Sequence, residues 1–201
     1  MKKVTILLLS MLSSSFLFAN PVPDSAQICL DCHGENGVST QPDIPTIAGA
    51  PTVFIEETLF AFRDKFRPGV RSEFRRGDLT RPATDMVAIT DDLDYPKILE
   101  IAEYFANLTF VPAKQPFNAE LVKKGAQLHF EQCEDCHRQG GKQPTANAAR
   151  LAGQWTPYLN KAMQYLKSGK RNTDQEMKDA IATLSESDWQ ALLAYYASQQ
   201  D

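Results

Sequence analysis

The sequence predicts an all-helical protein built from two tandem copies of one small domain. Three observations support this prediction. A short pattern, two cysteines separated by two residues and followed directly by histidine, occurs twice in the 201 residues. The residues that follow the first copy align with those that follow the second. Apolar residues recur at spacings of three and four in both halves, and no long stretch alternates with the period of two that a strand requires.

The internal repeat consists of blocks of similar residues at constant offsets. At an offset of 104 residues, Cys29 aligns with Cys133, residues 47–49 align with 151–153, and Phe54 aligns with Tyr158. At an offset of 91 residues, Met86 aligns with Met177, Leu93 aligns with Leu184, and residues 104–106 align with 195–197. The first half therefore has 13 additional residues between Phe54 and Met86. Matched blocks of this kind indicate a duplicated domain.

All four cysteines of the chain lie in the two C-x-x-C-H patterns, at 29–33 and 133–137. This pattern is typical of covalent attachment of c-type haem. Two thiols on one helical turn can each form a thioether with a vinyl group of the porphyrin, and the next histidine then lies under the iron. The sequence thus predicts two haems c, held by Cys29 and Cys32 and by Cys133 and Cys136, with His33 and His137 as proximal ligands. The alternatives are two disulfides or one zinc ion bound by four cysteines, and neither explains the histidines.

The boundary between the repeats is visible in the segment 110–117, which contains two prolines and few residues that favour a helix. It predicts an extended linker. We expect the first cytochrome c domain at 20–111, the linker at 112–118 and the second domain at 119–201. Each unit is about 90 residues long, so a buried haem would supply much of its apolar centre.

Four helices are predicted from apolar spacing. They lie at about 96–108, 120–133, 156–167 and 189–196. Ser185, followed three residues later by Asp188, is the expected N-cap of the last one.

The N-terminus resembles a secretory signal peptide, residues 1–19, with Lys2 and Lys3 before an apolar run. The alternative, an uncleaved membrane anchor, is disfavoured because the run is short and interrupted by three serines. Export to the periplasm agrees with haem attachment, which takes place outside the cytoplasm in bacteria. Removal of 19 of the 201 residues leaves 182, with 19 basic and 25 acidic residues and a net charge of −6. Nothing in this balance indicates nucleic acid as a partner.

The distal iron ligands follow from elimination. Besides the two proximal histidines the chain has only His129, which lies four residues before Cys133 and is expected to pack at a helix crossing near Gly125. Methionine is the other common distal ligand. Met86 is the only methionine in the first domain after signal removal. In the second, the repeat selects Met177, while Met163 fits an apolar helix face.

Two further expectations concern the surroundings of the haems. The carbonyls of Pro45 and Ala149, each 12 residues after a proximal histidine, are candidates to orient its free ring nitrogen. Residues 63–81 carry seven basic and three acidic side chains, although residues 20–111 as a whole carry 8 basic and 15 acidic ones. Two interpretations of this basic stretch stay open. Its arginines pair with haem propionates, or they form a docking face for an acidic redox partner.

The most specific segments lie in the second half: 112–115 (PAKQ), 133–142 (CEDCHRQGGK), 151–159 (LAGQWTPYL) and 195–200 (YYASQQ). In these the chain resembles the dihaem cytochrome subunit of flavocytochrome c sulfide dehydrogenase. The arginine-rich first half is more similar to the related dihaem cytochromes c4. The expected fold is all-α, two tandem class I cytochrome c domains.

The resemblance implies a non-catalytic, electron-accepting subunit. An FAD-containing sulfide dehydrogenase subunit would oxidise sulfide, and a small soluble cytochrome c or similar acceptor would take the electrons. FAD would belong to the partner, since this chain has no G-x-G-x-x-G pattern that opens a helix after a strand. The alternatives are a free-standing c4-type periplasmic carrier and a dihaem enzyme of the peroxidase or thiosulfate-oxidising kind.

Overall fold

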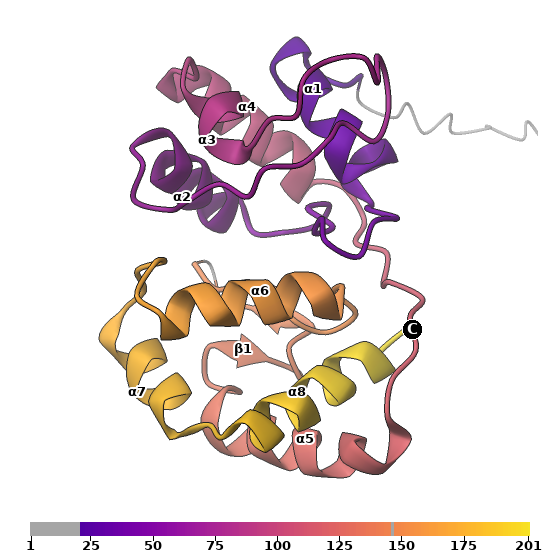
Figure 1. Cartoon of the computed structure of the whole chain (residues 1–201), viewed down its shortest axis with the longest axis vertical. Coiled ribbons are helices and arrows are strands. Elements are labelled where there is room, and N and C mark those ends of the chain that lie inside the picture. Colours follow the sequence, from indigo (N-terminus) through magenta and orange to yellow (C-terminus); the bar gives the residue numbers. More distant parts are fainter. Residues whose placement is uncertain (1–20, 146) are drawn as a thin grey trace, which may run out of the picture.

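The computed structural model describes residues 21–145 and 147–201, so the expected signal peptide at 1–19 lies outside the described residues. Helices dominate both halves (Figure 1). The first half contains α1 (Asp24–His33), the short 3-10 helix η1 (Glu35–Gly37), α2 (Thr52–Arg63), α3 (Met86–Thr90) and α4 (Tyr95–Ala106). The second contains α5 (Ala119–Gln132), β1 (His137–Arg138), β2 (Gln143–Pro144), α6 (Thr156–Lys167), α7 (Gln175–Thr183) and α8 (Glu186–Ser198).

The all-helical prediction is confirmed apart from one short hairpin. Strands β1 and β2 are two residues each and pair antiparallel, with His137 opposite Pro144. This pair closes the turn that follows the second attachment motif. Period-two alternation cannot reveal so short a pair, because two residues contain only one alternation.

Each half has its own apolar core. In the first half, Ile98, Ile101 and Phe105 of α4 are fully buried against α1 and α2. In the second half, α8 supplies Trp189 and Tyr196 to a core that also includes Leu159, Met163 and Ile181. The spacings of three and four predicted these buried faces, and the placement of Met163 in the core is confirmed.

Helix ends follow local capping chemistry. The Ser185 hydroxyl accepts the Asp188 amide while the Asp188 carboxylate accepts the Ser185 amide, which is a capping box and confirms the predicted start of α8. Asp85 and Asp174 cap α3 and α7 in the same way, the first by accepting the amide of Ala88 and the second that of Met177. These caps fix the start of the two helices that carry the predicted methionine ligands.

The two attachment motifs differ in backbone conformation. Cys29 and Cys32 lie within α1, but α5 ends at Gln132, one residue before the second motif begins. The expectation that Cys133 and Cys136 share a regular helical turn is therefore wrong in detail. The amide of Glu134 donates to the His129 carbonyl, five residues earlier, at 3.0 Å, and this bond ends the regular helix. A single helix-like bond, from the His137 amide to the Cys133 carbonyl at 2.9 Å, still sets the cysteine spacing.

The segment 112–118 carries no helix or strand and lies along the second half. Ala113 is buried, and its amide donates to the Gly153 carbonyl at 2.7 Å. Gln115 donates to the Gln154 carbonyl and accepts from the Thr156 amide. The segment is thus held to the second half rather than loose between the two.

Helices α5 and α8 cross closely at Gly125. A Cβ atom at this position would lie 2.0 Å from the carbonyl oxygen of Ala191, far inside van der Waals contact. Only glycine allows this approach, which brings His129 of α5 against Tyr196 of α8.

We predict that Gly125→Ala destabilises the protein by about 1–3 kcal/mol, as overpacking of a tight contact does. The measurement is chemical denaturation followed by helical circular dichroism. The control is Lys123→Ala on the exposed side of α5, where a change within about 0.5 kcal/mol is expected. Equal stability of the Gly125→Ala variant and the wild type would contradict the close crossing.

Candidate haem sites

The first attachment motif faces a cavity of about 410 Å³, a volume within the roughly 300–1,000 Å³ typical of ligand pockets. Cys29, Cys32 and His33 line it from α1, and Met86 lines it from α3. Its walls are mostly apolar and include Ile55, Leu59 and Phe62 of α2 and Ile101 and Phe105 of α4. The structure thus brings all four predicted site residues of the first half to one apolar cavity, which fits a haem.

His33 is oriented as a metal-binding imidazole. Its Nδ1 lies 2.9 Å from the Pro45 carbonyl oxygen, which confirms the predicted partner. Because a carbonyl only accepts, Nδ1 carries the proton and Nε2 keeps a free lone pair. Burial lowers the pKa of His33, and the bond to Pro45 opposes this shift only in part. The ring is therefore neutral at ordinary pH, the form that binds iron.

His137 repeats this arrangement in the second half. Its Nδ1 lies 2.7 Å from the Ala149 carbonyl oxygen, again 12 residues further along the chain, as predicted. Burial lowers its pKa, while the bond to Ala149 acts in the opposite direction. The two proximal sites therefore agree in ligand, tautomer and hydrogen-bond partner.

The loops that supply these carbonyls are built alike. The carbonyl of Gly37 accepts the amides of residues 47 and 48, and the carbonyl of Gly141 accepts those of 151 and 152. Both glycines have positive φ, 72° and 88°, which explains glycine at these turns. The same backbone scaffold thus places each carbonyl under its histidine.

The predicted distal methionines occupy comparable places. Met86 is the first residue of α3 and Met177 lies in the first turn of α7. Each is half-buried and packs at the edge of the core of its own half. Met86 lines the same cavity as His33. The assignment of both as iron ligands stays a prediction.

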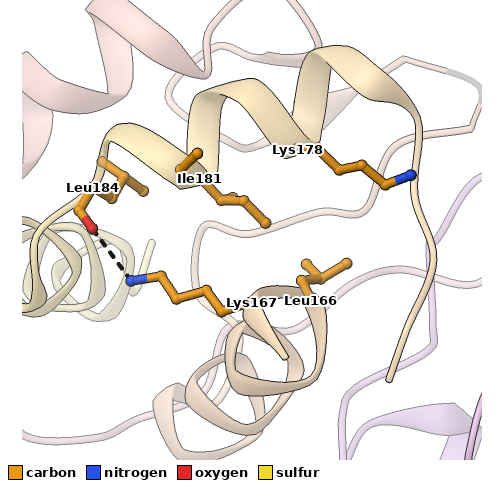
Figure 2. A pocket seen from close by; sticks show the side chains of 6 residues that line it. Leu166, Lys167, Lys178, Ile181 and Leu184 are labelled. Carbon is orange, nitrogen blue, oxygen red and sulfur yellow. Dashed lines mark hydrogen bonds between the residues drawn. The ribbon is translucent and has the colours of Figure 1, made fainter. Parts of the chain in front are cut away.

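A second hollow, of about 380 Å³, lies between α6 and α7 (Figure 2). Leu166 and Ile181 lie in its interior, and Lys167 donates to the Leu184 carbonyl at 3.4 Å. None of the four site residues predicted for the second half lines this hollow. It is separate from the attachment motif.

The thiols of Cys29, Cys32 and Cys133 lack the lowered pKa values that redox-active C-x-x-C pairs have. Burial raises the pKa of Cys29 to about 12, and it also raises those of Cys32 and Cys133. Redox-active C-x-x-C pairs instead have lowered pKa values. All four cysteines are free, and the described residues contain no group of three or more metal-ligating side chains. The disulfide and zinc alternatives therefore find no support.

His129 has the structural role that was predicted. It is buried, its Nδ1 lies 3.0 Å from the Tyr196 hydroxyl, and its Nε2 lies 2.9 Å from a carboxylate oxygen of Glu134. The same carboxylate accepts the amides of residues 139 and 140. With both ring nitrogens engaged, His129 fixes the turn at the second motif and has no nitrogen left for iron.

The basic stretch folds over the first attachment motif, where the amides of Arg75 and Arg76 donate to the Asp31 carbonyl. The Arg81 guanidinium bonds the Asp31 carboxylate at 2.6 Å, and that of Arg75 bonds Asp43 at 2.9 Å. Five of the seven basic side chains form ion pairs with acidic residues of the first half: Arg63, Lys65, Arg75, Arg76 and Arg81. Asp31, the partner of Arg81, lies inside the attachment motif itself.

Arg67 and Arg171 lie close to Tyr158 at the first cavity. Arg67 lines the cavity beside Tyr158, which comes from the second half. Burial acts to raise the pKa of Tyr158, but the guanidinium charges of Arg67 and Arg171 outweigh it and lower that pKa. Burial lowers the pKa of Arg171 to about 10, and the charge of Arg67 adds to this shift. A guanidinium group is suited to bind a carboxylate, so Arg67, which lines the cavity, is a candidate to hold a haem propionate. Sequence patterns gave no sign of Arg171, and they identified Tyr158 only as the repeat equivalent of Phe54.

The seam between the halves adjoins the first cavity. Ala149, Arg150 and Gln154 of the second half line that cavity too, and α6 lies on the side that faces the first half (Figure 1). The hydrogen bonds across the seam join Thr46 to Gln154, the Trp155 indole to the Ser39 carbonyl at 2.9 Å, and the Tyr158 amide to the Pro42 carbonyl at 3.1 Å. The stretch 154–158 thus binds the two halves of this chain together.

Comparison with known proteins agrees with this geometry. The model of a family described as cytochrome c oxidase, cbb3-type, subunit III matches residues 120–195. Cytochrome c4 of Azotobacter vinelandii is 26% identical over 182 residues, covering 85% of this chain and 83% of the relative. The structure of reduced recombinant cytochrome c4 from Pseudomonas stutzeri matches with a TM-score of 0.69 at 26% identity, covering 87% of this chain and 94% of that chain. Thiosulfate dehydrogenase (TsdBA) from Marichromatium purpuratum shares the fold, with a TM-score of 0.66 at 22% identity over 85% of this chain and 36% of that one.

The fold is mostly helical, with two tandem domains of the class I cytochrome c type. In sequence and fold the chain is cytochrome c4-like, and a c4-type electron-transfer protein is the class that the findings support. Among the described residues, no helix is long and apolar enough to span a bilayer.

We predict that Met86→Ala and Met177→Ala each remove one methionine-to-iron charge-transfer band and lower the reduction potential of one haem, because a methionine ligand raises that potential. Near-infrared spectra and a redox titration measure both effects. Met163→Ala is the control and should leave both bands intact. Loss of a band in Met163→Ala but not in Met177→Ala would show that the repeat alignment selects the wrong residue.

We predict that His129→Phe keeps both haem spectra but lowers stability by about 1–3 kcal/mol, because Tyr196 and Glu134 lose their buried partner. Denaturation curves and visible spectra of the same preparation test this. Disappearance of an axial-ligand signature in the variant would contradict the structural role.

Proposed function

We propose that this chain is an exported, periplasmic electron carrier of the c4 type, with one covalently bound haem c in each half. The observation that carries the proposal is the repeated proximal site: a histidine after two cysteines, with Nδ1 bound to the carbonyl 12 residues later. This geometry leaves Nε2 of His33 and His137 for iron, and it occurs once in each half.

In this proposal each side chain has a defined role. Cys29 and Cys32, and likewise Cys133 and Cys136, would hold the porphyrin through thioethers, while His33 and His137 would bind the iron. Met86 and Met177 would supply its second protein ligand. The bound haem supplies one-electron redox chemistry. The apolar walls of the first cavity exclude water, which favours a raised reduction potential.

An enzymatic role of the peroxidase or thiosulfate-oxidising kind is less well supported. Such chemistry needs an iron with an open or labile distal position. Met86 lines the same cavity as His33, so a methionine is available to close that position. Coordination by both residues suits electron transfer rather than substrate binding.

The second candidate function is the electron-accepting subunit of a sulfide-oxidising flavocytochrome c, with FAD on the partner and a small soluble cytochrome as acceptor. The resemblance of segments 112–115, 133–142, 151–159 and 195–200 favours it. The seam accounts for Gln154, Trp155 and Tyr158 without a partner. We therefore place the free carrier first.

The test is purification of the natively expressed protein followed by reductive titration. A free carrier should purify without flavin, take up two electrons per chain, show two low-spin irons with methionine bands, and turn over neither thiosulfate nor peroxide. Stoichiometric FAD in a stable complex would select the flavocytochrome role instead. A high-spin iron together with substrate turnover would contradict both electron-transfer roles.

A further inference from the structure

Gln154 is buried at the seam and uses its side-chain amide as a backbone amide would. Its Oε1 accepts the Thr46 amide at 3.0 Å, and its Nε2 donates to the Thr46 carbonyl at 2.9 Å. Its Oε1 also accepts the Trp155 amide at 3.1 Å. Both backbone groups of Thr46, a buried residue of the first half, are thus paired with one side chain of the second half.

Thr46 directly follows the residue that orients the first proximal histidine. The Pro45 carbonyl accepts Nδ1 of His33 at 2.9 Å, so its position sets the strength of that bond. From within the first half, the Thr46 hydroxyl accepts the Ser39 amide. The amide and carbonyl that define the direction of the 45–46 backbone are held from across the seam.

The sequence does not allow the reciprocal contact, in which a side chain of the first half would hold the loop of the second. The offset of 104 residues places Gln154 on Ala50 and Arg150 on Thr46. The alanine side chain has no amide group, so Ala50 cannot hold the backbone of Arg150 as Gln154 holds that of Thr46. The loop that presents the Ala149 carbonyl to His137 is therefore not fixed in this way. The pairing acts in one direction, from the second half onto the first proximal ligand.

We propose that Gln154 is a positioning residue for the first haem iron, through which the docking of the two halves tunes one reduction potential and not the other. The inference rests on the proposed function, since it takes His33 as the proximal ligand. A firm hydrogen bond at Nδ1 makes the imidazole a more basic ligand, which favours the oxidised iron. Loss of the Gln154 contacts loosens the Pro45 carbonyl and raises the potential of the first haem.

The experiment is a spectroelectrochemical titration of the haem-loaded full chain carrying Gln154→Met, which keeps the side-chain length but removes both hydrogen-bonding groups. The wave displaced by Met86→Ala in the wild-type background identifies the first haem. Trp155→Phe is the matched control, because it removes one seam bond, to the Ser39 carbonyl, and leaves both backbone bonds of Thr46 in place. Gln154→Asn, whose amide is one methylene shorter, serves if the methionine variant does not fold.

We expect Gln154→Met to shift only the first haem, toward higher potential, and to change the NMR signals of the His33 ring, while Trp155→Phe leaves both potentials in place. Gln154→Asn should shift the same wave in the same direction by a smaller amount. Unchanged potentials in the Gln154 variants, a shift of the second haem, or an equal shift in Trp155→Phe would each overturn the inference. Failure of the proposed function gives a different result. In that case the wild-type protein itself would lack two c-type haem signatures.

Discussion

The hydrogen bond between Nδ1 of a proximal histidine and a backbone carbonyl 12 residues later is the contact on which the rest of each half depends. It fixes the imidazole tautomer and leaves Nε2 available. To make it, the chain must turn back beneath the histidine, and the Gly37 and Gly141 carbonyls hold that turn by each accepting two amides. The next glycines, Gly49 and Gly153, donate their amides to the last long helix of their half, at Phe105 and Tyr196. One polar contact thus connects the attachment motif to the apolar core.

The two halves share this design but are stabilised by different surroundings. In the first, residues 64–85 fold over the motif, and Arg81 forms an ion pair with Asp31, which lies between the two cysteines. In the second, where no such insertion exists, the turn is held instead by His129 and Glu134. The repeat therefore preserves the histidine-to-carbonyl contact, while each copy supports its motif with its own residues. Such independent supports allow the two sites to differ in potential.

Local features of the structure could be predicted from the sequence, and contacts between distant segments could not. The spacings in α4 and α8, the capping box at Ser185 and the carbonyls of Pro45 and Ala149 all follow from patterns within a few residues or from the repeat. The pairing of Thr46 with Gln154 joins residues 108 apart and leaves no periodic signal. The ion pairs of the basic stretch could not be predicted for the same reason, because its acidic partners Asp31 and Asp43 lie in another part of the sequence.

The central claim is that each half attaches one haem through both of its cysteines, and the intact mass of the purified protein after denaturation and thiol alkylation tests it most directly. The account predicts a mass increased by two haems, with no alkyl group added, because all four thiols are consumed as thioethers. A protein that keeps its haem-free mass and gains four alkyl groups would contradict the account. One haem and two alkyl groups would restrict it to a single half.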